Sequence, residues 1–167
     1  MRAVAASVLV MGLIGALIVA SSTGPALASA DALAQIHQEA VGMSHESSVN
    51  TIDAANAILA QKAPGNPTMP AMPDHPIMSC CVHQLGRKML SCVTLEVTNT
   101  PVTIAVARAS DVKCPMSETI QRDGVTYSVQ SSGKTTMVMT SRDQKWLCVM
   151  GDLPREQLLD VASKLKF

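Results

Sequence analysis

The sequence predicts an α+β fold: an antiparallel meander of about six strands, with an N-terminal helical segment and a C-terminal helix packed on one face. Three observations predict it. Apolar residues recur at helical spacing from Asp31 to about Lys62, alternate with a period of two from Ser79 onward, and return to helical spacing after Pro154. A chain of 167 residues suits one ordinary domain. We divide it into four parts: 1–30, 31–62, 63–78 and 79–167.

Residues 1–30 have the pattern of an export signal. Arg2 precedes an uncharged apolar run of 18 residues, 3–20. Ala28 and Ala30 then form the small-x-small pattern that signal peptidase accepts, so we expect cleavage after one of them. A membrane anchor through the same run is the alternative, because 18 residues lie at the lower edge of spanning length. Either way we expect the remainder to be exported, to the periplasm or the extracellular space.

Residues 31–62 are expected to hold two helices. Asp31 can cap the first helix, and Gly42 ends it. Asn50 or Thr51 starts the second. The two helices would form an αα-hairpin or an extended cover for another element.

Residues 63–78 are predicted to be a linker, because five prolines among 16 residues forbid helix and disfavour paired strand. Beyond it, turn signals separate short alternating runs, beginning with a tight turn at Gly86–Arg87. A loop is expected from Asp111 to Asp123, and a helix with a leucine-rich stripe follows Pro154. The predicted strands are 79–84, 89–97, 102–107, 125–130, 134–140 and 145–150.

Composition excludes several classes of protein. Lys+Arg and Asp+Glu both number 13, so the formal net charge is zero, which weighs against a nucleic-acid partner. The hydrophobic content of 47% excludes a mostly disordered chain. The three aromatic residues are too few for base-stacking platforms.

The cysteines carry the first candidate chemistry. Counting outward from Gly86–Arg87 places Cys81 opposite Cys92, and directly opposed strand residues lie within disulfide reach, roughly 4.5–5.5 Å between α-carbons. A register slip of one residue would substitute Cys80, which faces the other side of the sheet. We therefore predict a disulfide between Cys81 and Cys92 in an oxidising compartment.

A second bridge could join Cys114 and Cys148, which leaves one of the five thiols over. The alternative is that Cys92 and Cys148 are buried strand residues, since a free cysteine behaves as a small hydrophobic side chain. Cys114, in a loop, could also be a reactive thiol.

Soft metal ligands gather around the end of the linker. Thioether, thiolate and imidazole together suit Cu(I), and thiolate with imidazole also suits Zn²⁺. Their spacing matches no strong zinc signature such as paired C-x-x-C, and methionines can equally fill gaps in a core. The candidate ligands for copper or zinc are Met69, Met72, His75, Met78, Cys80, Cys81 and His83.

Catalytic motifs are lacking in the sequence. No G-x-S-x-G surrounds a serine, and H-E-x-x-H is absent. We therefore expect the protein not to be an enzyme. His37 and His45 are expected to be solvated.

Three features of the C-terminal part carry a resemblance: a hairpin with a glycine–basic turn, Cys81 to Lys88; a strand pair around a short turn, Val93 to Val106; and the run Lys145 to Pro154 before a leucine-rich helix. From Pro73 onward the chain resembles the extracytoplasmic domain of bacterial transmembrane anti-sigma factors. Those proteins bind the sigma factor through a cytoplasmic domain that precedes the membrane span, and only Met1 and Arg2 precede the apolar run here. The resemblance implies an isolated exported domain of that kind.

We thus expect an exported, non-catalytic binding or envelope-sensing domain with a protein partner in the envelope. One alternative is a periplasmic protein that binds copper or zinc. The other is a thiol redox protein that uses Cys80 and Cys81, or Cys114.

Overall fold

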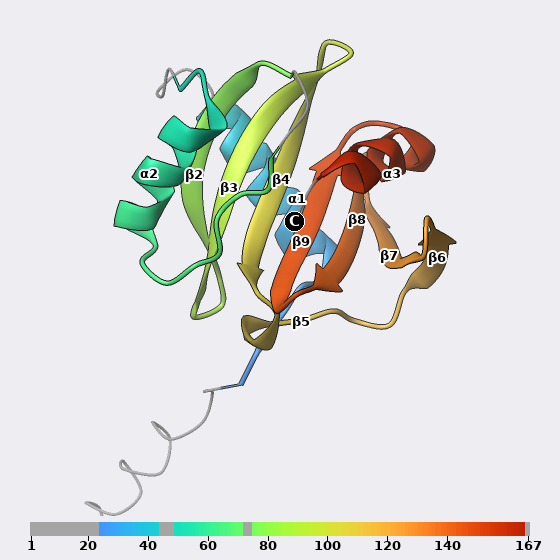
Figure 1. Ribbon diagram of the computed structural model, residues 1–167. Coiled ribbons are helices and arrows are strands. Elements are labelled where there is room, and N and C mark those ends of the chain that lie inside the picture. Colours follow the sequence, from blue (N-terminus) through green and yellow to red (C-terminus); the bar gives the residue numbers. More distant parts are fainter. Residues whose placement is uncertain (1–23, 44–48, 72–74, 166–167) are drawn as a thin grey trace, which may run out of the picture.

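A computed structural model describes residues 24–43, 49–71 and 75–165. Its centre is one seven-stranded antiparallel sheet in the order β2-β3-β4-β9-β8-β7-β6 (Figure 1). Two meanders therefore meet where β4 pairs with β9, and the predicted α+β meander is confirmed. The strands are β2 (Ile77–Leu85), β3 (Lys88–Val97), β4 (Thr100–Arg108), β6 (Glu118–Arg122), β7 (Val125–Ser132), β8 (Thr135–Arg142) and β9 (Lys145–Gly151).

Two-residue turns join the consecutive strands within each meander. Gly86 and Gly133 are the first central residues of two of these turns and have φ of 61° and 59°. In the turns at Thr98–Asn99, Asp123–Gly124 and Asp143–Gln144, both central residues have positive φ. Positive φ at these positions is what the hairpin turns of types I′ and II′ require, and such turns match the twist of the strands they join. The turns therefore fix the register of each hairpin.

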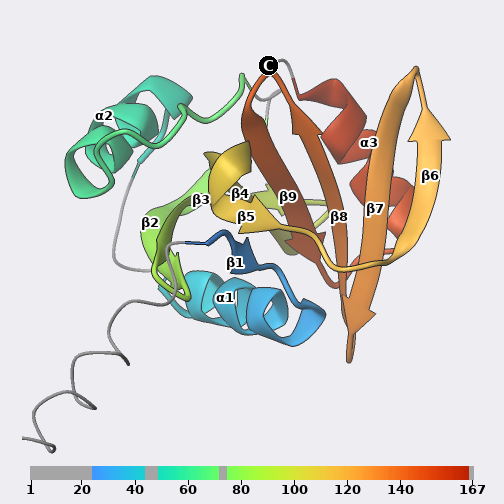
Figure 2. The ribbon, with the colours of Figure 1, turned by 90° about the horizontal axis from the view of Figure 1, so that it is seen from below.

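The helices lie on both faces of the sheet (Figure 2). Helix α1 (Ala30–Gly42) covers one face, whereas α2 (Ile52–Lys62) and α3 (Arg155–Lys164) cover the other. We predicted helices on one face only, and α1 departs from that prediction. The reason is that the central strands are apolar on both faces: Val93 packs in the core under α2 and α3, and its neighbour Cys92 in the core under α1. A sheet with two apolar faces needs cover on each, so the two N-terminal helices are covers and not an αα-hairpin.

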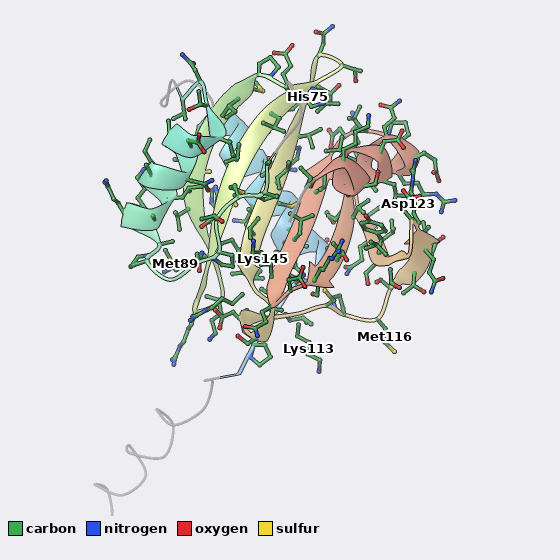
Figure 3. The ribbon with its side chains drawn as sticks, in the orientation of Figure 1. His75, Met89, Lys113, Met116, Asp123 and Lys145 are labelled. Atoms are coloured by element: carbon green, nitrogen blue, oxygen red, sulfur yellow. The ribbon has the colours of Figure 1, made fainter. Side chains whose placement is uncertain are left out.

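The segment predicted as a loop after Asp111 contains two short strands. Strand β5 (Val112–Lys113) pairs in parallel with β1 (Ala26–Leu27), and β6 adds an edge to the main sheet. Strand β6 is largely exposed and lacks a repeating apolar face, which is why its sequence does not reveal it. Between β5 and β6, Met116 points away from the body of the protein (Figure 3).

The proline-rich segment is held against the fold by side-chain amides. The backbone N–H of Met69 donates to Asn56 Oδ1 of α2 at 2.8 Å. The Asn66 amide donates to the Met89 carbonyl on β3 at 3.0 Å. Met69 itself is buried in the core under α2 and α3. The described part of the segment up to residue 71 therefore packs against α2 and β3.

The residues around the expected cleavage sites belong to the fold. Ser29, and not Asp31, caps α1, because its hydroxyl accepts a hydrogen bond from the Ala32 N–H at 3.4 Å. Ala28 is fully buried, and its N–H donates to the Lys113 carbonyl at 3.0 Å. Whether the chain is cleaved or anchored stays a prediction, since the run 3–20 lies outside the described residues. No helix in the described ranges is long and apolar enough to cross a membrane.

This arrangement predicts that a chain beginning at Asp31 is less stable than one beginning at Gly24. The shorter chain loses the Ser29 cap, worth about 1 kcal/mol, and the hydrogen bonds of β1, worth about 1 kcal/mol more. Urea unfolding of the two chains measures the difference. In the longer chain, Ser29→Ala should lower the free energy of unfolding by the contribution of the cap. Ser29→Asp should not, because aspartate can still cap the helix. Equal stability of the two chains would show that the segment does not contribute to the fold.

Candidate functional site

A row of thiols crosses the α1 face of the sheet. Cys81 on β2 is paired with Cys92 on β3, as predicted, and Ala105 on β4 separates Cys92 from Cys148 on β9. Cys80 faces the opposite core. Cys81 and Cys92 are 2% and 0% exposed, and all five cysteines of the chain are free thiols. The predicted register is therefore confirmed, and the disulfide stays a prediction.

An imidazole and a carboxylate extend this thiol pair toward the surface. His83 lies two residues along β2, so its side chain shares a face with Cys81. Its Nε2 lies 3.2 Å from Cys81 Sγ, and its Nδ1 lies 3.3 Å from Oε2 of Glu39 on α1. Gln35, one turn earlier on α1, donates to the other oxygen of Glu39 at 2.9 Å. His83 is buried and Glu39 is half exposed, so the chain of contacts leads from solvent to a buried sulfur.

The contacts within this group shift the protonation of its members. Hydrogen bonds from Cys92 and from His83 outweigh burial and lower the pKa of Cys81 to about 5. The hydrogen bond with Cys81 raises the pKa of His83, and Glu39 adds to that effect. The pKa of Cys92 is raised well above its usual value, first by its contact with Cys81 and then by burial. The site therefore favours a Cys81 thiolate, an imidazolium at His83 and a neutral thiol at Cys92.

The second predicted disulfide would join Cys114, which follows β5, to Cys148 on β9, and these two residues are not cross-strand partners. Cys114 follows β5 and accepts a hydrogen bond from the Trp146 indole N–H at 3.2 Å. Cys148 is fully buried on β9, and burial raises its pKa well above the ordinary value. A bridge between Cys114 and Cys148 stays a prediction.

The seven predicted metal ligands are divided by the fold. Met69 and Cys80 belong to the core under α2 and α3. Cys81 and His83 lie on the opposite face, against α1. Met72 lies outside the described residues. The remaining two candidates are partly exposed around the start of β2: His75 and Met78.

Since adjacent residues of a strand point to opposite faces, the seven candidates do not form one coordination site. Within the described ranges, no group of three His, Cys, Asp or Glu side chains is placed to hold a metal ion. Among the predicted ligands that the structure describes, Cys81 and His83 are in direct contact.

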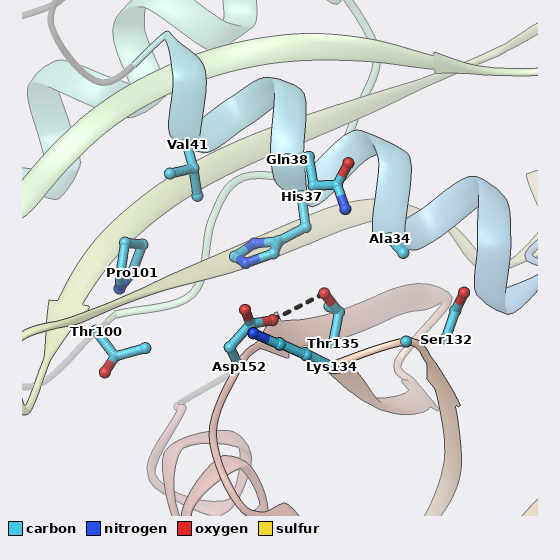
Figure 4. Close-up of a pocket in the computed structure, with 11 residues that line it drawn as sticks. Ala34, His37, Gln38, Val41, Thr100, Pro101, Ser132, Lys134, Thr135 and Asp152 are labelled. Atoms are coloured by element: carbon cyan, nitrogen blue, oxygen red, sulfur yellow. Dashed lines mark hydrogen bonds between the residues drawn. The ribbon is translucent and has the colours of Figure 1, made fainter.

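A pocket of about 460 Å³ opens between α1 and the ends of β4, β8 and β9 (Figure 4). Gln38 lines it from α1. Lys134 comes from the turn between β7 and β8, and Asp152 directly follows β9. The Thr135 hydroxyl donates to Asp152 Oδ1 at 2.9 Å and so holds the carboxylate in place. The pocket thus presents a cation and an anchored anion from different elements.

His37 lies between this pocket and the interior of the sheet. It is 5% exposed, so the expectation of a solvated side chain is wrong; His45 lies outside the described residues. Its Nδ1 lies 2.9 Å from the Thr103 hydroxyl, which lies 3.1 Å from that of Thr94. Burial lowers the pKa of His37, against the raising effect of Asp152. A neutral imidazole therefore lines the pocket near neutral pH.

Sequence reasoning did not find Glu39, Lys134 or Asp152. Each is a single charged residue without a neighbouring motif. Each lies near its partners only because the fold brings together segments that are distant in sequence. The capping and turn patterns place Lys134 and Asp152 at strand ends, but no local signal indicates that these ends lie under α1.

Comparison with protein-family models, with curated proteins and with solved structures finds no match for this chain. The class of protein is thus defined by the structure: an α+β domain whose helix α1 covers a thiol–imidazole pair and borders a charged pocket.

The contacts of Cys81 predict an ionised thiol in mildly acidic solution. Because its pKa is lowered, the thiolate should appear as pH rises through about 5 and be fully formed at neutral pH. The ultraviolet absorbance of the thiolate measures this titration in the folded, reduced protein. His83→Gln removes the cationic partner and should move the midpoint up, although the Cys92 hydrogen bond, the largest cause of the lowered pKa, remains. A wild-type midpoint that stays above 8, or one that Cys81→Ser leaves unchanged, would contradict the assignment.

Proposed function

We propose that this chain is an exported, non-catalytic binding domain of the cell envelope that receives a small zwitterionic ligand in the pocket beside α1. The observation that carries the proposal is that two opposite charges line that pocket: Lys134, from the turn between β7 and β8, and Asp152, which directly follows β9. Export is supported by the apolar run 3–20 and the processing pattern that follows it.

The size and lining of the pocket suit a small molecule. A volume of about 460 Å³ lies within the range of ligand pockets in proteins, which are partly apolar with a few placed polar groups. Ala34, Val41 and Pro101 supply apolar surface. Gln38 supplies an amide that can donate or accept a hydrogen bond. Such a lining favours a compact ligand with polar ends.

The charges indicate the chemistry of those ends. With His37 neutral, the charged residues that line the pocket, Lys134 and Asp152, sum to zero. A ligand of one charge would meet attraction from one residue and repulsion from the other, whereas a zwitterion can satisfy both. The ring nitrogen of His37 that Thr103 does not engage can add one hydrogen bond. Free amino acids and short peptides have this chemistry.

His37 and Asp152 each contact a threonine hydroxyl. The hydroxyl beside His37 belongs to Thr103, which is fully buried, so a ligand in the pocket does not reach it. A sensing role agrees with the resemblance to extracytoplasmic anti-sigma-factor domains, which is carried by the hairpin from Cys81 to Lys88 and the strands that follow it.

The proposal predicts binding that needs both charges of the ligand. Nuclear magnetic resonance titration of the full chain with free amino acids and dipeptides should shift the amide signals of Gln38, Lys134 and Asp152. The same compounds with a capped amine or a capped carboxylate should bind roughly tenfold more weakly, because each loses one charge-assisted hydrogen bond. Lys134→Gln and Asp152→Asn should weaken the binding of the zwitterions by a similar factor.

Matched controls come from the opposite end of β8. Asp143→Asn alters a charge in the turn before β9, and Lys145→Gln alters a charge at the first residue of β9; both should leave binding unchanged. The proposal fails if capped and uncapped compounds bind equally, or if the shifted signals lie away from the pocket.

A further inference from the structure

We propose that Cys81 and Cys92 form a reversible dithiol–disulfide couple that a small hydroperoxide oxidises, with Cys81 as the attacking thiolate and His83 as its proton donor. Four features carry this proposal: the paired positions of the two cysteines, the contact of His83 with Cys81, the link from His83 to Glu39, and the burial of both sulfurs. It does not depend on the pocket or on its ligand.

The fold leaves Cys81 one partner within reach. Cys92 lies directly across the ladder, and α-carbons of opposed residues are roughly 4.5–5.5 Å apart, within the range that a disulfide spans. Cys80 points into the other core. Cys148 lies three strands from Cys81, roughly 14 Å away, which exceeds the reach of a disulfide. Oxidation of Cys81 should therefore yield one defined bridge.

The imidazole of His83 makes Cys81 more reactive than Cys92. His83 Nε2 contacts only one of the pair, Cys81, at 3.2 Å, and Glu39 holds the far side of the ring. An imidazolium beside a sulfur stabilises the thiolate, which is the reactive form. Cys92 has no such neighbour among the described residues and stays protonated. Cys81 is thus the nucleophile, Cys92 is the resolving thiol, and Glu39 is a positioning residue.

Burial restricts the oxidant. Cys81 is 2% exposed beneath α1, so a protein disulfide cannot approach it without displacement of the helix. Hydrogen peroxide is small enough to enter through local fluctuation of the cover. The site therefore favours a small hydroperoxide over a macromolecular disulfide.

The reaction balances in two steps. The Cys81 thiolate attacks one peroxide oxygen; an S–O bond forms, the O–O bond breaks, and the leaving hydroxide takes the proton of His83 to become water. The Cys92 thiol then attacks the Cys81 sulfenic acid; an S–S bond forms, the S–O bond breaks, and a second water leaves with the Cys92 proton. The two thiols lose two electrons and hydrogen peroxide gains them. A dithiol reductant reverses the change by thiol–disulfide exchange.

The pH dependence of the first step distinguishes this site from an ordinary cysteine. The charged or titratable groups around Cys81 are His83 on β2, Glu39 on α1, Cys92 on β3 and, further away, Lys62 at the end of α2. With His83 present, the thiolate is formed already at pH 6 and the rate should stay nearly flat up to pH 9. Without it, the thiolate forms at higher pH and the rate should rise over part of that range, since the Cys92 hydrogen bond is then the main contact left to lower the pKa of Cys81.

The experiment follows oxidation of the reduced full-length protein by hydrogen peroxide with intact-mass and peptide mass spectrometry. We expect the loss of two hydrogens and one bridged peptide pair that contains Cys81 and Cys92. Cys92→Ser, or Cys92→Ala where serine disturbs folding, should instead accumulate a Cys81 sulfenic acid that a cyclic dione labels. Cys80→Ser is the matched control on the adjacent residue, and it should leave the rate and product unchanged.

His83→Gln should slow oxidation roughly tenfold at pH 6, because the gain in nucleophilicity of a more basic thiol offsets part of the lost thiolate. The same variant should overtake the wild type once the pH is high enough to ionise its thiol, because the more basic thiolate is the stronger nucleophile. Glu39→Gln should shift the profile in the same direction by a smaller amount. A purely structural histidine would not produce this crossover.

Three outcomes would overturn the proposal. The first is a bridge that involves Cys80, Cys114 or Cys148. The second is a pH profile that His83→Gln does not change in a protein whose circular dichroism shows it to be folded. The third is a Cys81–Cys92 bridge that a dithiol cannot reduce in the folded protein, which would make it a permanent staple. Ligand binding in the pocket can succeed or fail independently of each of them.

Discussion

The register between β2 and β3 is the constraint on which the chemistry of this protein depends. Residues of a strand alternate between two faces, so the register decides whether Cys80 or Cys81 meets Cys92 beneath α1. The turn at Gly86, with φ of 61°, makes Leu85 the partner of Lys88 and so pairs Cys81 with Cys92. A slip of one residue would carry His83 into the opposite core and away from Glu39. One turn therefore determines the neighbours of a sulfur five pairs away.

Two-sided burial is the second constraint, and it explains the place of the helices. The central strands β3, β4 and β9 are buried almost throughout, because their successive residues are apolar or small. One face therefore packs against α2 and α3 and the other against α1. This arrangement puts α1 over the thiol row, where it excludes water from Cys81 and supplies Glu39. The same helix could not do so in a hairpin with α2.

The sequence predicted the features that local rules control. The six main strands, the start of α2 at Thr51, the end of α1 at Gly42 and the cross-strand position of Cys81 and Cys92 agree with turn chemistry, capping and alternation. Features that depend on distant contacts were missed or misplaced. Strand β6 is stabilised by β7 and not by an apolar pattern of its own. The metal ligands were grouped by nearness in sequence, which ignored that Cys80 and Cys81 point to opposite faces.

Only part of the candidate site could be predicted from the sequence, because local rules place Cys81 and His83 but not Glu39. Cys81 and His83 are two residues apart, so alternation alone places them side by side on one face. Glu39 is 44 positions before His83 in sequence, and only the packing of α1 on the sheet brings it within 3.3 Å of the imidazole. The carboxylate matters because it can compensate a positive ring at the edge of an apolar core, where an unpaired charge would be costly. The lowered pKa of Cys81 thus has two sources: first the hydrogen bond from Cys92 across the ladder, and then His83, whose ring the half-exposed Glu39 carboxylate links to solvent.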